Sequence, residues 1–240
     1  MKNSEDKFGY SNRLDRNRAI LLGRDLLEMN DWVVLSCKES ALLGGAQAGD
    51  ATELVSISVV GPGDRALMDV LVRPNGAVNS ELLKLHGCDS AHIFNAPPFS
   101  GIHKILQAGF ARTRVIAWNS QKVKNTLSRL CESTNLPALK TVYVDLQTAY
   151  TAFLGEIDHS SNGDAYKTVV LPPQTDCSTA EVTPLTECRY LLTLVQEMAG
   201  SSQSTEAAAF DKNWSAAFYK PKLGPTQKLK EFLGLDNGQQ

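Results

Sequence analysis

Two polar side chains stand at the end of a strand that the sequence predicts to be buried. Residues 32–37 read Trp-Val-Val-Leu-Ser-Cys, and the chain then becomes polar before a small, glycine-rich turn. Side chains two positions apart on a strand share one face, so Ser36 and Lys38 lie together and Glu39 lies on the opposite face. The Lys38 ammonium places a positive charge there, which attracts a phosphate or a carboxylate and repels a metal cation.

Further basic residues occur near the ends of the predicted strands. If they gather at one edge of the sheet, they form a local positive patch that binds phosphate; scattered, solvated charges are the alternative. The residues, besides Lys38, are Lys122, Lys124, Arg129, Lys140, Arg112 and Arg114. Nucleic-acid binding depends on such a patch, because the net charge of the 240-residue chain is −2 and provides no overall positive field.

Trp118 and Asn119 come at the end of the short apolar strand predicted over 113–119, at the same edge of the sheet as Ser36 and Lys38. A tryptophan there either stacks on a nucleic-acid base, a contact that contributes about 1–3 kcal/mol per base, or belongs to the core and caps the sheet. Asn119 suits the N-cap of a helix over 120–133, because its side chain can accept a hydrogen bond from the helix's first turn.

Composition narrows the class of protein. The apolar fraction is 42% and the charged fraction 21%, which is typical of a globular protein. The five cysteines include no C-x-x-C pair and the four histidines form no cluster, so we expect reduced thiols, no metal site and no cofactor. The sequence has neither a signal peptide nor an apolar run of the roughly 18 residues that span a bilayer. We therefore expect a soluble, cytoplasmic protein without membrane contact.

The order of the predicted elements indicates an α/β domain with a mixed sheet. A helix over 12–29, packed on the outside of the domain, precedes three strands joined in an antiparallel meander. Strands and helices then alternate, which places helices on the sheet. The strands are predicted over 32–37, 53–60, 66–74, 113–119 and 140–146, and the later helices over 80–87, 97–110, 120–133, 147–155 and 184–200. The polar segment 156–181 supports no assignment.

The chain divides into four parts. They are an N-terminal helix packed on the domain (1–31), the α/β domain (32–200), a small polar linker (201–209) and a tail rich in aromatic residues and lysine (210–240). The tail's large apolar residues include Trp214, Phe218, Tyr219, Leu229 and Phe232. A short helix in the tail is marginal alone, so it either packs back on the domain or docks on a protein partner.

The order of these segments resembles the DEDD-type 3′–5′ exonucleases, the family of the proofreading subunit of bacterial replicative polymerases. The likeness runs over roughly residues 17–200 and is carried by six segments in order: 32–42, the strand pair 53–60 and 66–74, 85–89, 95–99, 115–127 and 184–200. The resemblance implies an RNase H-like, exonuclease-type mixed sheet flanked by helices. It also implies hydrolysis of a terminal phosphodiester by two metal ions that four acidic residues hold.

The resemblance places the family's acids on residues that are mostly not acids. The two acids of the first motif fall on Ser36 and Lys38, and the acid of the middle motif falls on Val123. The family's general base falls on Val182 and the last acid on Glu187. Only Glu187 keeps a carboxylate, and one carboxylate cannot hold two magnesium ions. In the family's geometry Lys38 and Glu187 face each other, so we expect them to form an ion pair.

Other acids show no pattern that would rebuild a metal site; they are Glu39, Asp50, Glu53, Asp69 and Asp145. The sequence therefore predicts a catalytically inactive exonuclease-like protein that serves as a protein-interaction or scaffold subunit of a larger complex. The alternative is a non-catalytic DNA- or RNA-binding protein that uses Lys38, Trp118, Asn119 and Lys122 in the former active-site cleft. An active metal-dependent 3′–5′ exonuclease is the third possibility.

Overall fold

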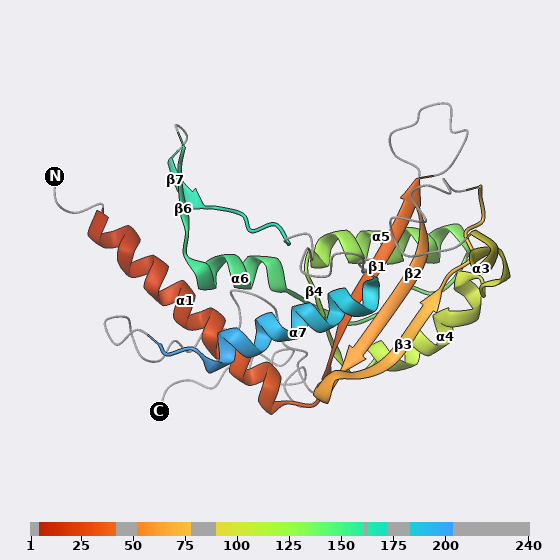
Figure 1. Cartoon of the computed structure of the whole chain (residues 1–240), viewed down its shortest axis with the longest axis horizontal. Coiled ribbons are helices and arrows are strands. Elements are labelled where there is room, and N and C mark those ends of the chain that lie inside the picture. Colours follow the sequence, from red (N-terminus) through yellow and green to blue (C-terminus); the bar gives the residue numbers. More distant parts are fainter. Residues whose placement is uncertain (1–4, 42–51, 78–89, 161–162, 172–182, 204–240) are drawn as a thin grey trace, which may run out of the picture.

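The structure is a computed structural model that describes residues 5–41, 52–77, 90–160, 163–171 and 183–203 (Figure 1). The predicted helix over 80–87, Val182 and the tail 210–240 lie outside these residues, as does most of the predicted linker. Among the helices within these ranges, none is long and apolar enough to cross a membrane.

A five-stranded mixed sheet with the order β3-β2-β1-β4-β5 forms the centre of the domain. The meander β1-β2-β3 is antiparallel, and β4 and β5 continue the sheet in parallel with β1. The strands are β1 (Trp32–Ala41), β2 (Thr52–Gly61), β3 (Arg65–Leu71), β4 (Arg114–Ala117) and β5 (Val142–Asp145). The predicted fold class, an α/β mixed sheet flanked by helices, is confirmed.

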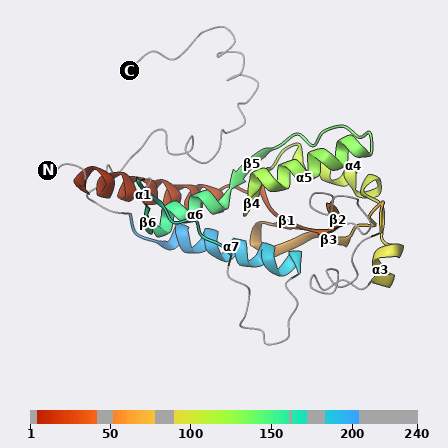
Figure 2. The ribbon, with the colours of Figure 1, turned by 90° about the horizontal axis from the view of Figure 1, so that it is seen from above.

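Helices cover both faces of the sheet (Figure 2). Helices α4 and α5 pack on one face, and α1, α6 and α7 pack on the other. The helices are α1 (Glu5–Glu28), α3 (Ser90–Asn95), α4 (Phe99–Phe110), α5 (Ser120–Ser133), α6 (Leu146–Leu154) and α7 (Pro184–Gly200). Helices α5 and α7 have the predicted bounds. The sequence did not predict α3, nor the polar hairpin of β6 (Ile157–Ser160) and β7 (Gly163–Tyr166).

Capping side chains explain where three helices begin. Asn119 accepts a hydrogen bond from the Lys122 N–H (3.0 Å) at the start of α5, as predicted. Asp145 accepts one from the Thr148 N–H (2.8 Å) at the start of α6. Thr183 caps α7 in the same way, and Pro184 occupies that helix's first turn, where no N–H donor is needed.

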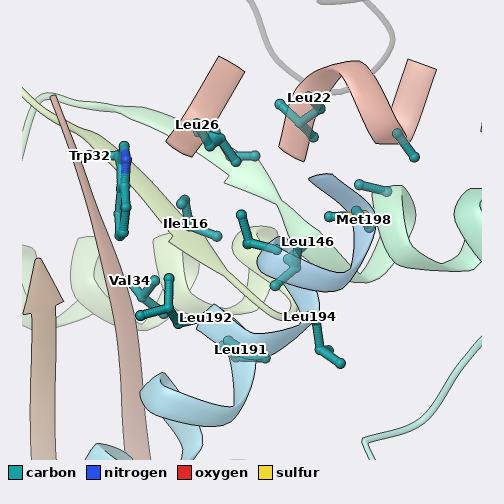
Figure 3. Packing of buried hydrophobic residues seen from close by; sticks show 14 of the residues in the cluster. Leu22, Leu26, Trp32, Val34, Ile116, Leu146, Leu191, Leu192, Leu194 and Met198 are labelled. Carbon is teal, nitrogen blue, oxygen red and sulfur yellow. The ribbon is translucent and has the colours of Figure 1, made fainter. Parts of the chain in front are cut away.

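The strand β1 is buried on both faces, so the core consists of two clusters. Trp32 and Val34 point toward α1, α6 and α7, where they meet Leu22, Ile116 and Leu191 (Figure 3). Val33 and Leu35, which alternate with them along β1, point toward α4 and α5. Because successive side chains of a strand point to opposite faces of the sheet, β1 contributes residues to both clusters.

Helix α1 is packed more deeply than its many charges suggest. Its residues Ile20, Leu22 and Leu26 are fully buried among α6, α7 and the sheet. At Gly23 the helix approaches α7 so closely that a Cβ atom would lie 2.9 Å from the Ala199 backbone nitrogen. A larger residue at this position would push the two helices apart.

Arg114 ties α1 to the sheet at the start of β4. Its side chain is only 7% exposed and forms ion pairs with Asp25 on α1 (2.7 Å) and with Asp31 just before β1 (2.6 Å). The Arg114 backbone N–H also donates to the Asp31 carbonyl oxygen (2.7 Å). The arginine therefore holds three segments that are distant in the sequence.

Replacing Arg114 by methionine leaves Asp25 and Asp31 close together without their shared cation. Removing one partner of a buried ion pair costs several kcal/mol, and the partial exposure of Asp31 reduces this value. We expect the free energy of unfolding to fall by about 2–4 kcal/mol, measured by urea denaturation. The matched control Arg112→Met changes an exposed arginine two residues away. Equal losses in both variants would contradict a structural role for the ion pairs.

Candidate functional site

A cleft opens where β1 and β4 separate. The two strands pair only from Trp32 to Val34 on β1, because β4 ends at Ala117 and the chain then turns into α5. Strand β1 continues to Ala41, and α7 begins close to it on the other face of the sheet. The gap lies at the carboxyl ends of parallel strands, which is where ligands bind in α/β sheets.

The cleft contains a pocket of about 390 Å³. Its lining consists of residues 35–39 of β1 together with Thr52, Trp118, Asn119, Lys122, Val123, Thr126 and Glu187. Every predicted site residue of the cleft that the structure describes is therefore in one place: Ser36, Lys38, Trp118, Asn119, Lys122, Val123 and Glu187. These residues come from β1, from the turn into α5, from α5 itself and from α7.

Lys38 and Glu187 form an ion pair inside this pocket, as expected from the resemblance. The Lys38 Nζ donates to Glu187 Oε2, and the two side chains are 20% and 16% exposed. The ammonium thus rests on the one carboxylate that remains at the positions given by the resemblance. The pair also joins the carboxyl end of β1 to the first turn of α7.

The other two positions carry no charge. Ser36 is 3% exposed, and its Oγ has no hydrogen-bond partner in the described part of the chain. Val123 is buried against the α4–α5 side of the sheet. A hydroxyl, an isopropyl group, an ammonium and one carboxylate do not fit a pair of magnesium ions, which take several carboxylate oxygens. Within the described ranges, no three Asp, Glu, His or Cys side chains converge in a way that could hold a metal ion.

Glu39 lies on the opposite face from Lys38, as predicted. The bulge between β1 and β2 places its extra residue, Val55, on β2, so the alternation along β1 is not broken. Glu39 accepts hydrogen bonds from Arg129 on α5 (2.5 Å) and from the Thr52 hydroxyl (2.9 Å). Its charge is therefore compensated by α5.

The remaining acids have local structural partners. Asp145 caps α6 and also accepts hydrogen bonds from the N–H and hydroxyl of Ser120 (2.8 and 2.9 Å). Glu53 accepts from the Asn75 N–H, and Asp69 from the Ser58 hydroxyl (2.6 Å). Asp50 lies outside the described residues. None of the three described acids lines the cleft pocket.

The rim of the cleft combines an aromatic ring and a cation. Trp118 is half-buried, with its ring 6.4 Å from that of Tyr150 and packed on the core, so it contributes to the core and also lines the pocket. Lys122 is exposed on the first turn of α5 and forms no ion pair with any residue that the structure describes. These two side chains remain available to a ligand.

The basic residues near the strand ends do not all gather at the cleft. Arg114 is buried at the amino end of β4, and Arg112 and Lys140 come just before β4 and β5, so all three lie at the edge of the sheet away from the cleft. Lys38 and Arg129 do lie at the cleft, but each is paired with a glutamate. The signal that could have separated these residues is strand direction: residues that precede parallel strands share the amino edge.

Cys37 contributes a neutral thiol to the pocket lining. Burial, together with the nearby Glu39 and Glu187 carboxylates, raises the pKa of this thiol to about 12. The thiolate is the nucleophilic form, so Cys37 is not a nucleophile near neutral pH.

No protein-family model and no curated protein matches the sequence. Solved structures do match the arrangement of its elements. A 3′-exonuclease, solved for its 3′-end-specific recognition of the histone mRNA stem-loop, superposes with a TM-score of 0.53 at 12% identity over 71% of this chain and 64% of its own. The fold is that of the 3′-exonucleases. The RNase H-like, exonuclease-type sheet expected from the resemblance is thereby confirmed.

Two further 3′-exonuclease structures have lower TM-scores. The nuclease domain of 3′hExo, a DEDDh family member bound to rAMP, gives 0.47 at 12% identity over 69% of this chain and 90% of that domain. A full-length 3′-exonuclease gives 0.42 at 12% identity over 53% of this chain. The present chain covers 48% of that full-length enzyme and 64% of the stem-loop-recognising one.

Replacing Lys38 by aspartate places two carboxylates against each other in the half-buried pocket. We expect the free energy of unfolding to fall by about 1–3 kcal/mol, because Glu187 loses its cation and gains a like charge. The matched control is Lys124→Asp, which makes the same change at an exposed position of α5. Thermal unfolding of both variants measures the difference; an unchanged midpoint in Lys38→Asp would show that the ion pair does not stabilise the fold.

Proposed function

We propose that this chain binds the end of a nucleic-acid strand in its cleft without hydrolysing it. The ion pair between Lys38 and Glu187 is the observation that carries this proposal. Two-metal hydrolysis needs acids that clamp the metal ions. At the positions that the resemblance assigns to acids, Lys38 brings an ammonium, and this ammonium is paired with the Glu187 carboxylate. The cleft itself stays open beside the ion pair, with a volume of about 390 Å³.

The rim of the cleft supports a nucleic acid as the ligand. Trp118 offers part of a ring on which a base can stack, and the Lys122 ammonium is available to a phosphate. The likeness in fold to a 3′-exonuclease that recognises an RNA stem-loop supports the same class of ligand for this chain.

The charges of the cleft predict a modest affinity with a weak salt dependence. Lys38 and Arg129 are neutralised by Glu187 and Glu39, which leaves Lys122, among the described residues that line the pocket, as the cation that meets phosphate. Each phosphate contact contributes about −0.7 to the slope of log K against log salt for a single strand. With one such contact we expect a slope of about −0.7, and a Lys122→Gln variant should bring it close to zero.

Fluorescence anisotropy of a labelled single strand and of a 3′-recessed duplex, followed for an hour with Mn²⁺ present, tests both halves of the proposal. We expect an immediate rise that then holds. A rise that decays as the label is released would mean that the chain cleaves its ligand. No rise at micromolar protein would reject nucleic-acid binding in the cleft.

Variants of Trp118 separate stacking from folding. Trp118→Leu keeps an apolar side chain but removes the aromatic face, and losing one stacked base corresponds to roughly 5- to 100-fold weaker binding. Trp118→Phe is the matched control, because it retains a ring and should bind within a few-fold of the unmodified chain. Equal affinities of the Leu and Phe variants would contradict base stacking.

The sequence of the tail favours a second candidate, a protein-interaction or scaffold subunit. Residues 210–240 contain Trp214, Phe218, Tyr219, Leu229 and Phe232, which is a large apolar content for a chain end. Under this proposal, a chain ending at residue 209 keeps its thermal unfolding midpoint but no longer co-purifies with the partner of the full chain. A truncated chain that unfolds would instead assign the tail to the core of the domain.

A further inference from the structure

A second pocket of about 400 Å³ lies outside the cleft, between α1, α6 and the segment that follows β7. Helices α1 and α6 lie side by side, and the β6–β7 hairpin follows directly after α6 (Figure 1). Apart from Ala152, the lining residues all carry polar side chains: Asp15, Gln147, Thr148, Thr151, Tyr166 and Thr168. None of these residues belongs to the cleft pocket.

Asp15 is the charged residue in the lining of the second pocket, and both of its carboxylate oxygens accept hydrogen bonds. Asp15 Oδ1 accepts a hydrogen bond from Arg18 (2.8 Å), and its Oδ2 accepts one from the Tyr166 hydroxyl (2.9 Å). Burial and this hydrogen bond to Asp15 raise the pKa of Tyr166, so the phenol stays protonated and continues to donate. A phosphate would meet the Asp15 carboxylate, and a metal ion would find that carboxylate already bonded on both oxygens.

The groups that remain are neutral hydrogen-bonding groups. Gln147 donates its amide N–H to the Val169 carbonyl oxygen (2.8 Å), which leaves its amide oxygen as an acceptor. The Thr151 hydroxyl oxygen accepts from the Val169 N–H (3.4 Å) and keeps its own O–H to donate. The Thr148 and Thr168 hydroxyls have no hydrogen-bond partner in the part of the chain that the structure describes. Hydroxyls both donate and accept, so such a lining suits a ligand rich in hydroxyl groups.

We infer that the second pocket binds the hydroxyl groups of a neutral sugar. The volume of the pocket accommodates one sugar ring. The threonine hydroxyls and the Gln147 amide oxygen can donate to and accept from the hydroxyl groups of a sugar, and the ring of Tyr166 provides an apolar wall. The sugar has two possible sources, a free saccharide or the ribose of an RNA strand. An RNA strand in the cleft could reach this pocket, because the two sites are adjacent. The backbone N–H of Gln147 donates to the Trp118 carbonyl oxygen (2.9 Å), which joins the first turn of α6 to the rim of the cleft.

Sugar binding here does not require that the cleft bind nucleic acid, and it is measured separately. Saturation-transfer NMR on the full chain with methyl β-D-ribofuranoside, its 2-deoxy analogue and ribose 5-phosphate reports the free ligand. We expect saturable binding of the ribofuranoside, and at least about fivefold weaker binding of the other two. The 2-deoxy analogue lacks one hydroxyl that the pocket can bond, and ribose 5-phosphate brings a negative charge close to the Asp15 carboxylate.

Two threonine variants test the assignment of the pocket. Thr148→Val and Thr151→Val keep the side-chain shape and remove one hydroxyl each, so each should weaken ribofuranoside binding at least about fivefold. Thr193→Val is the matched control, because Thr193 is exposed on α7 and its hydroxyl bonds within that helix to the Tyr190 carbonyl oxygen (2.7 Å). Far-UV circular dichroism checks that all three variants are folded.

RNA and DNA strands of the same sequence distinguish the two sources of sugar. If an RNA strand supplies the ribose, RNA binds more tightly than DNA and Thr148→Val removes the difference, since the 2′-hydroxyl is what distinguishes the two. If the ligand is a free sugar, the ribofuranoside binds and the two strands bind alike. Loss of strand binding with sugar binding retained would reject only the cleft proposal. Absence of saturable sugar binding together with equal binding of RNA and DNA would overturn sugar recognition at the second pocket.

Discussion

The arrangement of this domain depends on the burial of β1 on both faces. From Trp32 to Leu35 every side chain of β1 is in a core cluster, and each cluster recruits its own helices. Burying an aliphatic or aromatic side chain stabilises a fold by roughly 1.5–3 kcal/mol, so this short segment holds the two layers together. At Ser36 the apolar run ends. The residues from Ser36 to Glu39 line the cleft pocket.

The cleft holds an ion pair between two elements that are distant in the sequence. Lys38 and Glu187 occupy facing positions on β1 and α7, and their ion pair joins these elements. The ammonium is bonded to the one carboxylate at the positions that the resemblance assigns to acids, Ser36, Lys38, Val123 and Glu187. Chemistry and shape are therefore separable in this fold: the position of a side chain follows from the backbone, and its charge follows from the residue alone.

Helix α6 connects the two pockets. Its first turn is capped by Asp145, which also binds Ser120 at the start of α5, and its Gln147 N–H is bonded to Trp118 at the lip of the cleft. The next turn carries Thr151 into the second pocket. On the core side of α6, the Tyr150 ring lies between the Phe153 ring of the same helix and the Trp118 ring of the turn before α5. A rigid element of this kind sets a fixed separation between a ligand in the cleft and a ligand beside α1.

The sequence by itself determined the elements and the residue types at the cleft. Apolar periodicity and local caps such as Asn119 are short-range signals, so the bounds of α5 and α7 and the mixed sheet could be predicted. The scarcity of acids at the cleft was expected from the resemblance, which assigns the acid positions to Ser36, Lys38, Val123 and Glu187. Apart from the ion pair of Lys38 and Glu187, which was expected from the resemblance, only the tertiary structure decided which charges meet. Arg114 lies with Asp25 and Arg129 with Glu39 because strand direction and helix packing bring together residues about 90 positions apart. The segment of the hairpin β6–β7 has no apolar periodicity, and the hydrogen bond that joins Tyr166 to Asp15 in the pocket beside it spans 151 positions, which no local pattern predicts.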